Sequence, residues 1–266
     1  MKIASWNVNS LSVRIEQVIG WLKNTSVDVL CLQELKMESS KFPAQLFHEL
    51  GYQAIWSGQK TYNGVAIISK TPLTVEQYNN PYYADAQQRL IAANIQINDQ
   101  TIRLICVYCP NGSELGSDKF TYKMQWFDAL NVYLKEQLNT YPNLVLTGDF
   151  NIAPDDRDVH AKYQGDILVS PEERQQFSNL LALGLHDSFR LFEQEEKSFS
   201  WWDYRQFAFK RNAGLRIDHL LISNALTKKC TASSIDKAPR GNERPSDHTP
   251  CLLYTSDAAD DSLRVD

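Results

Sequence analysis

Short apolar runs, each only a few residues long and rich in Val and Ile, limit what this chain can fold into. Runs of this length and β-branched content favour strands over helices. They are Ile3–Trp6, Val27–Leu32, Val65–Ile68, Ile102–Tyr108, Leu144–Leu146 and Ile217–Ile222. Between them lie patterns with helical spacing, in which apolar side chains share one face: Ile15, Val18, Ile19 and Leu22, and then Phe127, Leu130, Leu134 and Leu138. The chain is therefore predicted to be an α/β protein.

Capping and turn signals add detail to this prediction. Ser170-Pro171-Glu172-Glu173 is a capping box with proline at the first helical position, and Gly184 is expected to end that helix. Asn63-Gly64 and Asn98-Asp99 are turn signals between strands, so some strands are expected to pair antiparallel. We therefore expect a mixed sheet system and not a regular series of βαβ units.

Residues 1–255 contain no linker, repeat or low-complexity stretch and are expected to form a single domain. Residues 256–266 carry four Asp and one Arg and offer few apolar side chains. Such a segment buries too little surface to offset the entropy of ordering it. We therefore expect an acidic, disordered tail, and a foreign origin of this segment is an open alternative.

The balance of charge excludes one class of protein. With 27 Lys and Arg against 32 Asp and Glu, the net charge is −5. A simple basic coat for nucleic acid is excluded, because such proteins bind through an excess of cations. An enzyme that meets a polyanion through a local patch or a metal ion is not excluded.

Cysteine usage and the N-terminus indicate where the protein works. The five cysteines are Cys31, Cys106, Cys109, Cys230 and Cys251, and only Cys106 and Cys109 have a C-x-x-C spacing. Without a second pair, buried thiols in a reducing compartment are favoured over a zinc site. No run of about 18 apolar residues and no apolar leader occurs. We expect a soluble, cytoplasmic protein without a membrane partner.

Polar side chains with metal-binding or acid–base chemistry lie at the edges of the apolar runs. The segments concerned are Trp6-Asn7-Val8-Asn9, Leu32-Gln33-Glu34, Thr147-Gly148-Asp149-Phe150-Asn151, Arg216-Ile217-Asp218-His219 and Pro245-Ser246-Asp247-His248. Loops at strand ends commonly hold functional groups. Their carboxylates and amides are hard oxygen ligands suited to Mg²⁺ or Mn²⁺, and His248 can titrate near neutral pH. Any single one is more often a turn former or a cap, but their joint occurrence favours a site.

A basic and aromatic stretch runs from Lys197 to Arg216. Five cations against one Asp give it a local charge of +4, and six aromatic residues lie between them. Cations for phosphates and rings for bases are what contact with nucleic acid requires. A core cluster of aromatic side chains with a solvated, charged rim is the alternative. Lys237, Arg240 and Arg244 add a second basic approach ahead of Asp247.

Taken together, the motifs resemble the exonuclease III family of the endonuclease/exonuclease/phosphatase superfamily. The resemblance runs from Met1 to about Pro250. It rests on the strand-edge segments above together with Asn63-Gly64-Val65-Ala66, Ser200-Trp201-Trp202-Asp203-Tyr204-Arg205 and Gly214-Leu215-Arg216-Ile217-Asp218. It implies a four-layered α/β/β/α sandwich of the DNase I-like kind, in which helices flank two packed mixed β-sheets.

The resemblance also implies an activity. It is that of a metal-dependent nuclease of base excision repair, which hydrolyses phosphodiester bonds in double-stranded DNA with abasic sites or blocked 3′ ends. The implied reactions are 3′→5′ exodeoxyribonuclease, abasic-site endonuclease and 3′-end phosphatase or phosphodiesterase action. Mg²⁺ is the implied cofactor, Mn²⁺ its substitute, and the protein is expected to be a monomer.

Site residues follow from the resemblance, position by position. The residues implied in catalysis are Tyr108, Asp149, Asn151, Asp218 and His248; those implied in metal binding are Asn7, Glu34, Asp149, Asn151, Asp247 and His248; those implied in DNA contact are Arg89, Trp202, Arg216 and His248. In this scheme Asp149 orients or deprotonates water, Asn151 holds a phosphoryl oxygen, and Asp218 supports His248. Whether Asp149 or His248 is the general base stays open, as does the number of metal ions.

Two other functions remain as alternatives. Another phosphoesterase of the superfamily shares the same acids and histidine, but the chain has no membrane-binding segment that would favour a lipid substrate. A catalytically silent DNA-binding module is disfavoured, because Glu34, Asp149 and His248 are all present.

Overall fold

The computed structural model describes residues 1–97 and 100–256. The predicted turn at Asn98-Asp99 lies outside the described residues, as does the expected acidic tail apart from Ser256. The strands on either side of that turn, β6 (Leu90–Ile97) and β7 (Gln100–Tyr108), pair antiparallel as expected. The extent of the domain over residues 1–255 stays a prediction.

Two six-stranded sheets form the centre of the molecule. The first sheet has the order β11 (Cys230–Ile235), β12 (Cys251–Thr255), β1 (Lys2–Asn7), β2 (Val29–Gln33), β4 (Val65–Ser69) and β3 (Gln53–Ser57). The second sheet has the order β5 (Thr74–Tyr78), β6, β7, β8 (Leu144–Asp149), β10 (Asp218–Ser223) and β9 (Leu185–Asp187). Each sheet is mixed: β1 and β2 pair parallel, as do β7 and β8, and the other pairs are antiparallel.

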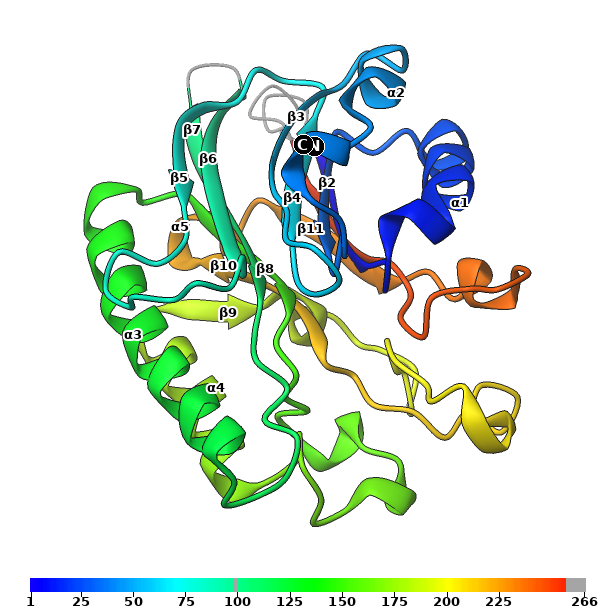
Figure 1. The fold of residues 1–266 in the computed structure, drawn as a ribbon. Helices are drawn as coiled ribbons and strands as arrows, with labels where there is room; N and C mark the ends of the chain where they lie inside the picture. The colour runs from blue at the N-terminus through cyan, green and yellow to red at the C-terminus, as the bar shows by residue number, and fades with distance from the viewer. Residues whose placement is uncertain (98–99, 257–266) are drawn as a thin grey trace, which may run out of the picture.

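Helices cover the outer face of each sheet, which gives the predicted four layers (Figure 1). The first sheet packs against α1 (Leu11–Thr25) and α2 (Ala44–His48), and the second against α3 (Asp118–Thr140) and α4 (Pro171–Ala182). A short helix, α5 (Asn224–Thr227), follows β10. Single 3₁₀ turns complete the chain: η1 (Ser39–Lys41), η2 (Asp156–Asp158), η3 (Ala161–Tyr163), η4 (Ser188–Leu191), η5 (Arg205–Phe207) and η6 (Ala238–Gly241).

The layering explains why the apolar runs are mostly apolar on both faces of the strand and do not alternate regularly with polar residues. In β7, Leu104 and Cys106 face the core between the sheets, while Ile105 and Val107 pack beneath α3 and α4. Because both faces of such a strand are covered, every position favours an apolar side chain. None of the helices in the described part of the chain is long and apolar enough to cross a bilayer.

Predictions that depended only on neighbouring residues in the sequence are confirmed. The Ser170 side chain accepts a hydrogen bond from the Glu173 amide and the Glu173 carboxylate accepts one from the Ser170 amide, so the capping box is present. Gly184, at φ +95°, follows that helix. All five cysteines are free thiols, four of them buried, as expected.

Candidate active site

The candidate active site lies at one end of the two packed sheets, where strands of both stop. Asn7 ends β1, and Glu34 follows β2, which runs parallel beside it. In the second sheet Tyr108 ends β7 and is in register with Asp149, the last residue of β8. Asp218 begins β10, which runs antiparallel to β8, and is also in register with Asp149. Strand direction and register therefore gather residues from distant parts of the chain.

Asn7 joins the acids of the two sheets. Its amide nitrogen donates hydrogen bonds to Glu34 Oε1 at 2.8 Å and to Asp149 Oδ2 at 2.8 Å. Its amide oxygen accepts from the Asn9 backbone at 2.9 Å. The nitrogen and not the oxygen of Asn7 faces the carboxylates in this arrangement, so its expected role as a metal ligand stays a prediction.

A tight turn after β8 aims the Asp149 carboxylate. Asn151 adopts φ +50°, a left-handed conformation that is uncommon for residues other than glycine, and its amide donates to Asp149 Oδ1 at 2.9 Å. Gly148 has no room for a side chain, because a Cβ there would lie 1.8 Å from the Val107 carbonyl oxygen. The backbone of β8 thus lies very close to that of β7 at Gly148, directly before Asp149.

His248 lies between two acids and is buried. Its Nδ1 is 2.9 Å from Asp218 Oδ2, and its Nε2 is 3.7 Å from Asp149 Oδ2. Burial alone would lower the pKa of His248, but the carboxylates of Asp218 and then Asp149 raise it above its usual value. The ring is therefore held as an imidazolium whose Nδ1–H donates to Asp218. The Ser200 hydroxyl donates to Asp218 Oδ2 at 2.6 Å, and this contact was not predicted, although Ser200 begins one of the segments on which the resemblance rests.

Asp149 experiences opposing influences on its ionisation. Burial is the largest of these and raises the pKa of its carboxyl group, the His248 cation lowers it, and Asp218 raises it again. The net direction is upward, so Asp149 holds a proton more readily than an exposed aspartate. This places an acid–base group at the junction of the two sheets.

Tyr108 and Arg89 border the site on one side. The Arg89 guanidinium lies over the Tyr108 ring, 4.8 Å from its centroid, and donates to the Tyr108 carbonyl at 3.1 Å. Burial, followed by the negative charges of Glu34 and Asp149, raises the pKa of the Tyr108 phenol well above its usual value, which keeps it a neutral hydrogen-bond donor. Both residues line an adjoining groove of about 630 Å³ that also includes Tyr62, Asn111 and Lys119.

Three side chains could hold a metal ion together. Among the described residues, ligand atoms of Glu34, Asp149 and His248 lie within 4.8 Å of one another. A cluster that contains two carboxylates suits a hard divalent cation. Because His248 is held as a cation by Asp218, we regard the two carboxylates as the better donors. Lys36 stands close by, with its ammonium 2.8 Å from Glu34 Oε2.

Asp247 lies beside this group but outside it. Its Oδ1 accepts from the Asn9 side chain at 2.8 Å, and its Oδ2 accepts from Trp201 Nε1 at 3.0 Å. Burial raises the pKa of the Asp247 carboxyl group, yet His248, Asn9 and Trp201 outweigh burial and the net direction is downward. Its expected role in metal binding stays a prediction.

Two of the expected DNA contacts are corrected by burial. Trp202 is 0% exposed, packs edge-on against Phe209 and donates from its indole nitrogen to Asn212 at 3.1 Å. Arg216 is 1% exposed, and its guanidinium pairs with Asp158 at 2.6 Å and Asp187 at 2.7 Å. Neither side chain offers a surface to DNA. Both side chains are buried by tertiary packing. The alternative of an aromatic core with a solvated, charged rim describes Trp202 correctly, whereas Arg216 is a buried cation and belongs to neither description.

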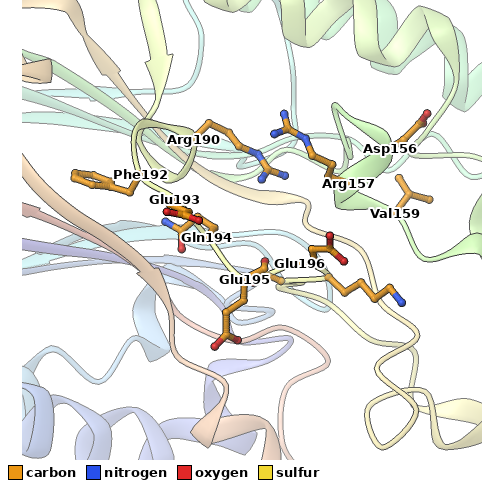
Figure 2. Close-up of a pocket in the computed structure, with 11 residues that line it drawn as sticks. Asp156, Arg157, Val159, Arg190, Phe192, Glu193, Gln194, Glu195 and Glu196 are labelled. Carbon is orange, nitrogen blue, oxygen red and sulfur yellow. Dashed lines mark hydrogen bonds between the residues drawn. The ribbon is translucent and has the colours of Figure 1, made fainter.

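A second pocket lies away from this centre and contains none of the expected site residues. It encloses about 480 Å³ between the η2 segment and the segment after η4. Figure 2 shows Arg157 and Arg190 together with Glu193, Glu195 and Glu196 around it. Acidic and basic groups are mixed on its walls, without the convergence of buried acids that marks the candidate active site.

Comparisons with known proteins agree with this geometry. Residues 4–248 match the profile of the endonuclease/exonuclease/phosphatase family. Exodeoxyribonuclease III of Haemophilus influenzae is 35% identical over 261 residues, covering 94% of this chain and 98% of the relative. The solved 3′ phosphatase NExo from Neisseria, bound to a product DNA hairpin, superposes with a TM-score of 0.93 at 45% identity, covering 96% of this chain and 99% of that one. An AP endonuclease from Archaeoglobus fulgidus gives a TM-score of 0.91 at 36% identity, with coverages of 96% and 99%.

Proposed function

The chain belongs to the exonuclease III group of the endonuclease/exonuclease/phosphatase family, and on that premise we propose that it is a hydrolytic DNA repair nuclease. The proposal rests on one arrangement of five side chains. Asn7 bridges Glu34 of the first sheet to Asp149 of the second, and the Asp218–His248 pair faces Asp149 across 3.7 Å. A phosphodiester is anionic, so a site that hydrolyses it must supply positive charge and an activated water together.

Double-stranded DNA with abasic sites or blocked 3′ ends is the substrate that we propose. The Neisseria relative was solved with a DNA hairpin, and the Archaeoglobus relative is named an AP endonuclease. In this chain the groove beside the centre combines the cations of Arg89 and Lys119 with the exposed ring of Tyr62. Cations can pair with phosphates, and an exposed ring can stack on a base. Monomeric state and a cytoplasmic location stay predictions.

Asp149 is proposed as the general base. Its carboxylate stands at the centre of the constellation, and the Asp149 pKa, raised by burial, suits proton transfer near neutral pH. It takes a proton from water as the new oxygen–phosphorus bond forms and the bond from phosphorus to the leaving oxygen breaks. His248 is the weaker candidate for the base, because Asp218 keeps it protonated.

The remaining groups are proposed to stabilise charge on the phosphate. His248 and the neutral phenol of Tyr108 can donate hydrogen bonds to its non-bridging oxygens, and the side chain of Asn151 lies beside Asp149 to add another. Glu34, with Asp149 near it, would hold Mg²⁺, or Mn²⁺ in its place. When bound, the ion supplies Lewis-acid stabilisation of the phosphate and of the leaving oxygen.

The function is tested with three duplexes that carry an abasic site, a 3′-phosphate or a blunt end. We expect cleavage in Mg²⁺ and none in EDTA. Glu34→Gln keeps the size of the side chain but removes the ligand charge, so activity should collapse and higher Mg²⁺ should restore part of it. Glu38→Gln, at an exposed carboxylate in the same segment, is the matched control and should behave as wild type. Full activity of wild type in EDTA, or of Glu34→Gln at low Mg²⁺, would contradict the metal role.

A further inference from the structure

Lys123, in α3, is a completely buried cation that lies behind the candidate active site and does not enter it. Its side chain is 0% exposed. Its ammonium donates to the carbonyl oxygens of Asn151 at 2.7 Å and Asn111 at 3.1 Å, and it is paired with the carboxylate of Glu173. An ammonium has three N–H donors, so each of them has a partner here. Two of the three serve backbone carbonyls and not the acid.

The two carbonyls belong to the segments that follow β7 and β8, which carry site residues. Asn111 comes shortly after Tyr108, and its side-chain nitrogen donates to Asn151 Oδ1 at 3.0 Å. Asn151 Nδ2 donates to the Cys109 carbonyl at 2.9 Å. Both ends of the Asn151 amide are therefore oriented by the segment that Lys123 holds. The left-handed conformation of Asn151 costs free energy and persists only where its surroundings fix it.

Glu173 fixes the ammonium in turn. Its second carboxylate oxygen accepts from the Ser170 amide at 3.0 Å and the Ser170 hydroxyl at 2.8 Å, as part of the capping box of α4. The aliphatic stem of Lys123 passes close to Gly112, where a Cβ would lie 3.1 Å from Lys123 Cδ. The ammonium is thus held by the start of α4 and by the chain that follows β7, with little freedom to move.

We propose that Lys123 is a positioning residue for phosphoester hydrolysis, which acts by holding the Asn151 and Asn111 carbonyls so that the Asn151 amide faces the reacting phosphate. The inference rests on the proposed function. Burying a charge is costly, and a buried ion pair adds little net stability compared with apolar side chains of similar size. A charged donor at this place therefore suits the orientation of the site better than it suits stability.

The test removes the charged pair without leaving one charge unpaired. In Lys123→Met/Glu173→Gln both members become neutral and keep similar volumes. We expect kcat on the 3′-phosphate duplex to fall roughly 100-fold, because small misplacements of a reacting group have losses of that order. KM should change far less than kcat, since Asn111 is the one residue among the groove residues named above that hydrogen-bonds Lys123. Lys135→Met, at an exposed position of the same helix, is the matched control.

A second comparison separates positioning from general support of the fold. If Lys123 acts through Asn151, the double variant should cost little further kcat in an Asn151→Ala background. An equal loss in both backgrounds would overturn the inference. Lys123→Gln keeps an N–H donor near the Asn151 carbonyl, so it should show a smaller loss and provides a milder variant if the double one unfolds.

The outcomes also separate this inference from the proposed function. Wild type that hydrolyses none of the duplexes would contradict the function itself. Active wild type together with a folded Lys123 variant of unchanged kcat would overturn the inference alone. Folding is checked by circular dichroism and melting temperature before any rate is compared.

Discussion

The surroundings of His219 lead us to predict that the folded protein loses stability in acid. Its Nδ1 lies 3.1 Å from an Arg216 nitrogen, and its Nε2 lies 2.9 Å from the Ile152 carbonyl oxygen. A neutral ring satisfies both, with Nδ1 accepting and Nε2–H donating, whereas a charged ring would face the Arg216 cation. Burial, followed by Arg216, lowers the pKa of His219 from 6.5 to about 4.

The direction of the effect follows from proton uptake. Between pH 6.5 and about 4 the unfolded chain binds a proton at His219 and the folded chain does not. Stability from this residue is therefore complete above pH 6.5 and is lost as the pH falls towards 4. At about 1.4 kcal/mol for each unit of pKa, the loss is about 3 kcal/mol when pH 4 is reached.

The assay is urea unfolding of wild type and His219→Gln at a series of pH values from 8 to 4. Other groups titrate in this range, so the quantity that matters is the difference between the two proteins. Glutamine does not titrate, and the advantage of wild type should shrink by about 3 kcal/mol across the window. His48→Gln, at an exposed histidine, controls for loss of an imidazole. A difference that stays constant with pH, or that grows in acid, would refute the reasoning.

Two further predictions concern the backbone and the charge of the site. Gly148→Ala should prevent folding or lower the free energy of unfolding by several kcal/mol, because its Cβ would lie 1.8 Å from a carbonyl oxygen. Gly20→Ala has open space around it in helix α1 and should raise the free energy of unfolding by about 0.5–1 kcal/mol. Similar melting temperatures for the two variants would contradict this account. Asp218→Asn removes the carboxylate that keeps His248 protonated, so kcat should fall about 100-fold or more and the pKa of His248 should drop, as followed by NMR titration of the ring. An unchanged titration would show that another group sets the charge of His248.

The strands and the acids were predictable because their signals are local. The β7 run is apolar without interruption from Leu104 to Val107, and Asp149 stands where an apolar run stops, so both could be recognised from neighbouring residues. By contrast the extent of β6 was not predicted, although a strand was expected before the Asn98-Asp99 turn, because Asn94 and Gln96 interrupt its apolar residues. Residue types and spacing therefore carried the fold class and the position of the acids along the chain.

Contacts across the molecule account for what could not be predicted. Ser200 meets Asp218 and Lys123 meets Asn151 only after β-strands and helices have packed, and nothing near them in the sequence marks these partners. Trp202 and Arg216 look like surface residues for DNA in a basic stretch, yet tertiary packing buries both. Burial is decided by the whole fold, which composition alone does not contain.

The groups that we propose to act in hydrolysis are divided between two sheets, so the proposed mechanism requires both sheets to be assembled. Asn7 and Glu34 come with one sheet, Asp149 and Asp218 with the other, and His248 arrives late in the chain, where Ser246 bonds the Asn7 carbonyl across 239 positions. A chain that is still being synthesised or is partly unfolded contains only some of these side chains in place. On this proposal, hydrolysis of DNA is expected only after the two sheets have packed together, and the rate of hydrolysis would report on that packing.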